Sequence, residues 1–170
     1  IFLNGNEVLE VFLALLNIGA VIVPLNMRLA KGELEYIIDH ADVSTVVLSP
    51  EFANLFESLK GNLPKVKKYL VWGDTAPLGM RPLTKPGEPS SAPFADKPIR
   101  QEDTAFILYT AGTTGKPKGV ILSHQNMVWS AVNLAFDSEF RPQWKILLVC
   151  PLYHAAAIML VFTSLYVGCG

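Results

Sequence analysis

The sequence predicts an α/β fold in which a largely parallel sheet carries helices on both faces. Short runs of β-branched and apolar residues alternate along the chain with stretches whose apolar residues recur at helical spacing. This alternation is typical of parallel sheets with crossover helices. Hydrophobic residues make up 51% of the 170 residues and charged residues 17%, against roughly 25% charged in an average soluble domain. The chain can therefore bury a sizeable core.

The first part of the chain supplies three helices and three strands. After Asn6, a suitable helix cap, apolar residues recur at helical spacing up to Gly19, which suits a helix end. The pattern then predicts a strand over 20–23, a helix over 32–41, a strand over 45–48, a helix over 51–59 and a strand over 65–72.

A proline-rich loop is expected over 74–98. Six prolines fall in this stretch: Pro77, Pro82, Pro86, Pro89, Pro93 and Pro98. Proline has no backbone N–H and interrupts both helices and strand ladders. The stretch therefore separates the first run of elements from the second.

The remaining residues continue the alternation. The pattern predicts strands over 104–109, 119–122 and 145–150, a helix capped by Ser123 and reaching about Phe136, and a terminal helix from about Ala155. Residues 146–170 contain no Asp, Glu, Lys or Arg, so a membrane helix is an alternative for them. Pro151, Tyr153 and His154 interrupt that run, and a buried strand, a loop and a buried helix fit better.

The net charge argues against some classes of binding partner, and the cysteine content argues against some kinds of site. A net charge of −1 and a pI near 6.3 give no electrostatic footprint for nucleic acid or an anionic membrane. Cys150 and Cys169 lie outside any Cys-x-x-Cys pattern, which indicates neither a zinc site nor a disulfide framework. A reduced, cytoplasmic location is the expectation. The chain begins at Ile1 without a leader and ends at Gly170 within apolar sequence, so we expect an excerpt of a longer protein.

One segment carries residues suited to chemistry. Residues 110–119 hold three glycines, three threonines and two lysines without any acidic residue. Glycines let backbone N–H groups converge on phosphate oxygens, and hydroxyls and lysines add donors and positive charge. A Walker loop is excluded, because Lys116 is followed by Pro117 where that motif needs Ser or Thr. A polyphosphate-binding loop and a solvated turn with incidental lysines both remain open on composition alone.

Three segments together carry a resemblance to a known family. YTAGTTGKPKGV (Tyr109 to Val120) is very similar to the glycine- and threonine-rich signature of the adenylate-forming superfamily. GAVIVPLNMRLAKGELEYIIDHAD (Gly19 to Asp42) resembles the amino-terminal region of acyl-CoA synthetases, and PLYHAAA (Pro151 to Ala157) resembles their aromatic-His segment. The resemblance implies that residues 1–170 are an incomplete portion of the N-terminal AMP-binding domain, without the C-terminal domain and its catalytic lysine.

The family's reaction implies the substrates and cofactors. A carboxylic acid, fatty or aryl, would react with ATP to form an acyl-adenylate, with Mg²⁺ neutralising charge, and coenzyme A would then displace AMP. By similarity, the phosphates would be bound by Thr110, Ala111, Gly112, Thr113, Thr114, Gly115 and Lys118. Lys118 would act on the leaving pyrophosphate, and the Thr110 hydroxyl would lie near the metal. Ala111 stands where serine is commonest, and Lys116 occupies a variable position. The excerpt alone is expected to be inactive.

His154 and Tyr153 are the candidate substrate-binding residues. A single histidine on an apolar stretch is more often a core residue, but the resemblance implies that His154 positions the acyl carboxylate, with Tyr153 behind it. His124 is interpreted as an exposed first-turn residue. Trp129, Trp144 and Phe162 are predicted to lie in the core, and Cys150 is predicted to be a small buried hydrophobe.

Two other functions stay open beside the CoA ligase. The chain could belong to an adenylation domain that loads a carrier protein, or it could be a non-catalytic remnant that binds nucleotide or a protein partner. No nucleic acid partner and no transmembrane segment are expected. The identity of the acid and the formation of a homo-oligomer are open at this point.

Overall fold

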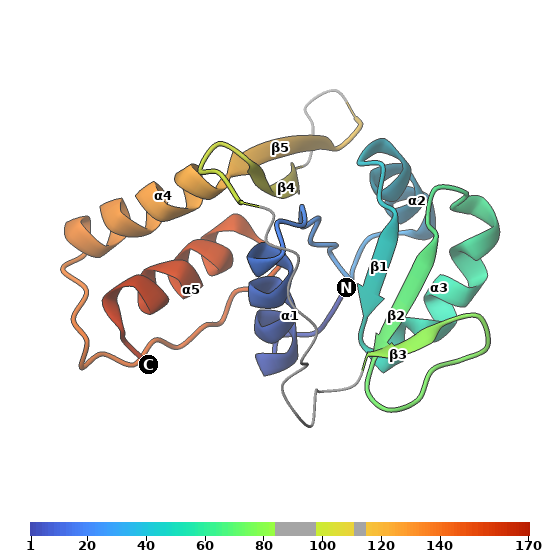
Figure 1. The fold of residues 1–170 in the computed structure, drawn as a ribbon, viewed down its shortest axis with the longest axis horizontal. Coiled ribbons are helices and arrows are strands. Elements are labelled where there is room, and N and C mark those ends of the chain that lie inside the picture. The colour runs from blue at the N-terminus through green and yellow to red at the C-terminus, as the bar shows by residue number, and fades with distance from the viewer. Residues whose placement is uncertain (84–97, 111–114) are drawn as a thin grey trace. The chain divides into compact units, whose positions relative to one another are not determined.

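The fold of this chain is seen in a computed structural model (Figure 1). The structure describes residues 1–83, 98–110 and 115–170. The chain divides into two compact units, unit 1 (Ile1–Val11 and Leu25–Asp96) and unit 2 (Phe12–Pro24 and Lys97–Gly170). The division falls within the first helix, α1 (Asn6–Asn17), which lies where the sequence predicts it.

Unit 1 is built on a parallel sheet with the strand order β1-β2-β3 (Figure 1). Its strands are β1 (Thr45–Leu48), β2 (Lys68–Trp72) and β3 (Arg81–Leu83). The helical segments are α2 (Lys31–His40), α3 (Ala53–Leu59) and the 3-10 turns η1 (Pro50–Phe52) and η2 (Lys60–Asn62). Leu34, Leu48 and Phe56 are fully buried in its core, which confirms the apolar faces predicted from the sequence.

The sequence misses β3, which lies inside the stretch predicted as a loop over 74–98. Pro82 pairs with Val71 in parallel register, and the Gly73 N–H donates to the Leu83 carbonyl at 3.1 Å. Among the described strands β3 has one neighbour, β2, and an edge position is where a strand tolerates proline. Residues 84–97 of the predicted loop lie outside the described residues.

Unit 2 contains an antiparallel pair and two long helices. The strands are β4 (Thr104–Thr110) and β5 (Lys118–Ser123), and the helices are α4 (His124–Asp137) and α5 (Ala155–Val167), which pack side by side (Figure 1). The predicted strand over 20–23 is reduced to one parallel bridge, Ile22 with Phe106. Phe106 is fully buried, with the rings of Phe12 and Phe162 edge-on to it at 5.6 and 6.2 Å.

The strand predicted over 145–150 is wrong. Near its beginning, the Ile146 N–H donates to the Gly170 carbonyl at 2.7 Å and the Gly170 N–H donates to the Trp144 carbonyl at 3.1 Å. The side chains of Leu147 and Val149 are 85% and 77% exposed. An apolar run forms a strand only where a neighbouring strand pairs with it, and the described residues provide none for this segment.

The alternative of a membrane helix for the last residues receives no support. α5 has 13 residues. Within the described parts of the chain, every helix is too short or too polar to cross a bilayer.

Candidate functional site

The candidate phosphate loop joins the two strands of the antiparallel pair. Thr110, the last residue of β4, lies directly opposite Lys118, the first residue of β5. Both side chains are exposed, and opposite residues of an antiparallel pair project from the same face of the sheet. The hairpin register therefore brings together a hydroxyl and an ammonium group that are eight positions apart in the sequence.

The tip of this loop is only partly described. Ala111, Gly112, Thr113 and Thr114 lie outside the described residues. Gly115 is exposed and has a φ of +92°, a backbone conformation that favours glycine. Lys116 is exposed as well.

The end of β5 away from the loop leads directly into α4, whose start is capped. The Ser123 hydroxyl accepts from the Asn126 N–H at 3.2 Å, and the Ser123 N–H donates to the Asn126 side-chain oxygen at 2.9 Å. This reciprocal cap satisfies donors that a helix start leaves open. Backbone bonds from His124 to Asp103 and from Gln125 to Gln101, at 3.1 and 2.8 Å, add to it. The predicted cap at Ser123 is thereby confirmed.

Tyr153 and His154 lie at the start of α5, also in unit 2. Their ring centroids are 4.5 Å apart with an angle of 51° between the planes. His154 is the N-cap residue, its N–H donates to the Pro151 carbonyl at 3.0 Å, and its carbonyl accepts from the Ile158 N–H at 3.2 Å. The imidazole is exposed, so the side chain is accessible to a ligand.

The described part of the chain contains no group of three His, Cys, Asp or Glu residues that could hold a metal ion. A magnesium ion at this loop would therefore depend on the Thr110 hydroxyl and on phosphate oxygens, together with groups outside the described residues. Hydroxyl and phosphate oxygens are hard ligands of the kind that Mg²⁺ prefers, so the Thr110 hydroxyl is of a kind that fits such an ion.

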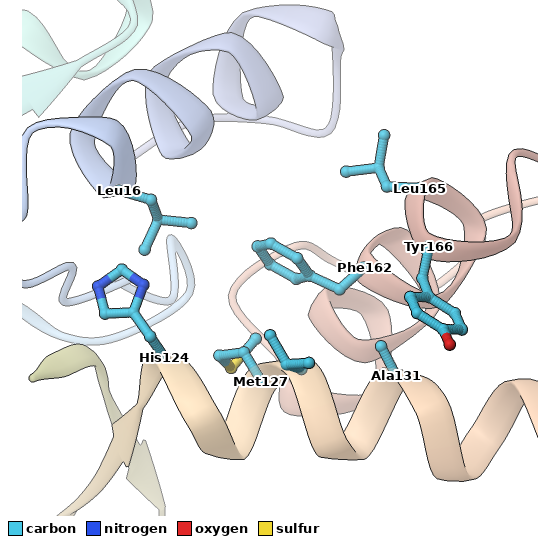
Figure 2. Close-up of a pocket in the computed structure, with 8 residues that line it drawn as sticks. Leu16, His124, Met127, Ala131, Phe162, Leu165 and Tyr166 are labelled. Carbon is cyan, nitrogen blue, oxygen red and sulfur yellow. The ribbon is translucent and has the colours of Figure 1, made fainter. Parts of the chain in front are cut away.

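A second feature of unit 2 is an apolar cavity of about 320 Å³ between α1, α4 and α5 (Figure 2). Figure 2 shows His124 and Met127 on α4, Phe162 and Tyr166 on α5, and Leu16 on α1. The His124 Nε2 atom is buried and has no hydrogen-bond partner among the residues that the structure describes. His124 is thus a first-turn residue as predicted, but its interpretation as exposed is wrong for the ring nitrogen, and no sequence pattern signalled the cavity.

Several side chains predicted to be buried are exposed. Trp129 and Trp144 are 57% and 42% exposed, and Cys150 is also exposed. Each lies on α4 or in the segment over 138–154, where the described neighbours leave one side open. Phe162 is partly buried and packs against Phe106, and it also lines the cavity.

Comparison with known proteins gives the family. The family described as AMP-binding enzyme matches residues 1–170. A feruloyl-CoA synthase from an Amycolatopsis species is 32% identical over 159 residues, covering 93% of this chain and 29% of the relative. A long-chain-fatty-acid–CoA ligase from Thermus thermophilus is 32% identical over 164 residues, covering 94% and 29%.

A solved structure shows the same fold. The anthranilate CoA ligase AuaEII in complex with anthranoyl-AMP has a TM-score of 0.80 and 25% identity, over 100% of this chain and 33% of that chain. The chain belongs to the AMP-binding enzyme family. It spans about 29% of the length of the first curated relatives that it matches.

Proposed function

We propose that this chain is part of an ATP-dependent acid–thiol ligase. The full-length protein would convert a fatty or aryl carboxylic acid to an acyl-adenylate and then to a thioester of coenzyme A. The observation that carries the proposal is the family match over all 170 residues. The exposed Thr110–Lys118 pair at the base of a loop without acidic residues supports it.

The first half-reaction determines which groups the loop must provide. A carboxylate oxygen attacks the α-phosphorus of ATP, the bond to the bridging oxygen breaks, and pyrophosphate leaves with the electron pair. Two anions must approach each other, so the protein has to position them and offset their charge. Cationic and neutral donors held in advance at the phosphates serve this purpose.

The loop residues have separate roles in this proposal. The backbone N–H groups and hydroxyls of Thr110, Ala111, Gly112, Thr113, Thr114 and Gly115 bind the phosphates. Lys118 neutralises the charge that grows on pyrophosphate as it leaves. Thr110 contributes an oxygen near Mg²⁺, which when bound would neutralise the phosphates and polarise them toward attack.

His154 and Tyr153 are proposed to position the carboxylic acid. An imidazole in contact with a neighbouring ring is restricted in rotation, and its ring N–H can donate to a carboxylate oxygen. The Tyr153–His154 ring contact and the exposure of His154 support this role.

The chain covers only part of the relatives' length, and we propose that the remaining catalytic groups, including those of a C-terminal domain, lie outside it. The isolated 170 residues are then expected to show no ATP–pyrophosphate exchange. Robust exchange by the purified fragment would contradict this arrangement.

The test of the proposal uses the full-length protein. ATP–pyrophosphate exchange is measured over a panel of short, long and aromatic acids, followed by thioester formation with coenzyme A or with a phosphopantetheinyl carrier protein. The CoA ligase proposal expects exchange with at least one acid and transfer to coenzyme A. Transfer only to the carrier protein would favour a carrier-loading domain, and absence of exchange with every acid would contradict an adenylating enzyme.

A further inference from the structure

Gly119 lies directly opposite Tyr109 in the antiparallel pair. Side chains alternate between faces along a strand, so Tyr109, Ile107 and position 119 share one face, and Thr110 and Lys118 share the other. Position 119 immediately follows Lys118 in β5, and Tyr109 immediately precedes Thr110 in β4. Contacts that hold Tyr109 and position 119 in place therefore also restrain Thr110 and Lys118, the residues on either side of the loop.

The space above Gly119 is already filled by its neighbours. A Cβ atom at this position would lie 2.8 Å from Ile107 Cγ2 and 3.2 Å from the Cε2 and Cζ atoms of the Tyr109 ring. Cβ atoms essentially never come closer than 3.0 Å to a non-bonded heavy atom beyond their chain neighbours. The Tyr109 ring and the Ile107 side chain therefore lie against the bare backbone of β5.

The two glycines at the second end of the loop serve different purposes. Gly115 has a φ of +92°, and a Cβ atom there would meet no described residue within 4 Å, so its requirement is conformational. Gly119 has no left-handed φ, so its backbone conformation does not itself require glycine. Its requirement is steric, and the contact that it permits is with Tyr109 and Ile107.

We propose that Gly119 and Tyr109 are positioning residues for the phosphate loop. The absent Cβ lets the Tyr109 ring and Ile107 lie across the β5 backbone, and this contact fixes the direction in which Thr110 and Lys118 face the phosphates of a nucleoside triphosphate. The inference rests on the proposed function, and it assigns a role to residues on the face of the hairpin opposite the phosphate donors.

The first test is Gly119→Ala in the full-length enzyme. Displacing the base of the loop by a fraction of an ångström is expected to slow acyl-adenylate formation by about 10- to 100-fold. Thioester formation from preformed adenylate should be little changed, because it no longer involves pyrophosphate. Rapid-quench measurement of both half-reactions gives the comparison. Gly61→Ala is the matched control, since a Cβ atom there would meet no described atom within 4 Å beyond its chain neighbours and its φ lies outside the left-handed region.

A second variant keeps the proposal testable if Gly119→Ala folds poorly. Ile107→Ala removes the Cγ2 atom that causes the closest contact and leaves the Tyr109 contacts at 3.2 Å, so Ile107→Ala/Gly119→Ala should recover part of the lost adenylation rate. Tyr109→Leu, which removes the ring, should slow adenylation, whereas Tyr109→Phe, which keeps it, should not. Equal slowing of both half-reactions by Gly119→Ala, no slowing at all, or equal losses in Tyr109→Leu and Tyr109→Phe would overturn the proposal.

Failure of this inference is distinguishable from failure of the proposed function. If Lys118→Ala slows adenylation and Gly119→Ala does not, only the positioning role is wrong. If Lys118→Ala leaves adenylation unchanged, the role of the loop in the proposed function is itself wrong.

Discussion

Unit 1 and unit 2 differ in where their large apolar side chains lie. Among the described residues, unit 1 exposes Leu3 and Leu78, and the other large hydrophobic side chains found at the surface belong to unit 2. They include Ile121 on β5, Trp129 on α4 and Tyr166 on α5. Few large apolar side chains of unit 1 are exposed, whereas unit 2, which carries the candidate site, exposes many among its described residues.

The largest effects that test this difference between the two units are expected from truncating two buried aromatic side chains. Phe56 of unit 1 and Phe106 of unit 2 are both fully buried, and truncation of either to alanine should cost about 3–5 kcal/mol of unfolding free energy. Hydrogen exchange after Phe56→Ala should rise first in α3, β1 and β2. After Phe106→Ala it should rise first in β4 and β5. Uniform acceleration along the chain in both variants would show that the two units do not open separately.

The next largest effect is expected at the proposed site in unit 2. Lys118→Ala in the full-length protein should slow acyl-adenylate formation by about 100-fold, since one preorganised donor to a developing charge is commonly worth that much. Thioester formation from preformed adenylate should be far less affected. Lys145→Ala, which removes an exposed lysine of the same unit, is the control. Comparable slowing of both half-reactions by Lys118→Ala would argue against its assigned role.

A smaller effect on stability is expected at the first residues of two helices, α4 in unit 2 and α2 in unit 1. Ser123 caps α4 through its hydroxyl, whereas Ala30 occupies the same extended conformation before α2 without a side-chain cap. Ser123→Ala should cost about 1 kcal/mol, and Ala30→Ser should stabilise by up to about 1 kcal/mol. Urea unfolding of the two variants gives both values. A loss on adding serine at position 30 would mean that the Ala30 N–H bond to Glu33, at 2.8 Å, already serves the helix start better.

The smallest effect concerns the ion pairs of unit 1. The Lys65 ammonium contacts the carboxylates of Asp42 and Asp39 at 2.7 and 3.0 Å. Its hydrogen bond and charge lower the pKa of Asp42 below the usual 3.8, and the hydrogen bonds to Asp42 and Asp39 raise the pKa of Lys65 above 10.5.

The stabilisation from Asp42 is therefore present above pH 3.8 and is lost as pH falls through its lowered pKa. The contribution from Lys65 is present below pH 10.5 and is lost as pH rises through its raised pKa. Lys65→Met should remove both dependences while changing stability near neutral pH only slightly, because the groups are exposed. Lys67→Met, at a neighbouring exposed lysine, should leave both dependences in place, and thermal melts across pH measure the difference.

Much of the fold was predictable because local patterns decide it. Some features depend only on residues a few positions apart. They are the apolar periodicity of α1, α2 and α4, the β-branched residues of β1 and the Ser123 cap. The prediction of a strand over 145–150 was wrong because strand formation is not decided by the local sequence alone. This segment has the composition of a strand, but pairing depends on a neighbour that the local sequence cannot supply.

Some features of the candidate site were likewise predictable from the sequence, and others are seen only in the structure. The composition of residues 110–119 indicated donors for phosphate, and the signature around them indicated the family, from the order of amino acids alone. The pairing of Thr110 with Lys118, the Tyr109 ring lying over Gly119 and the buried His124 Nε2 beside the apolar cavity come from the tertiary structure. By itself the sequence determined which chemical groups are present, because side-chain chemistry is local. Only the fold decided which of them meet and which are covered, because register and burial depend on residues distant along the chain.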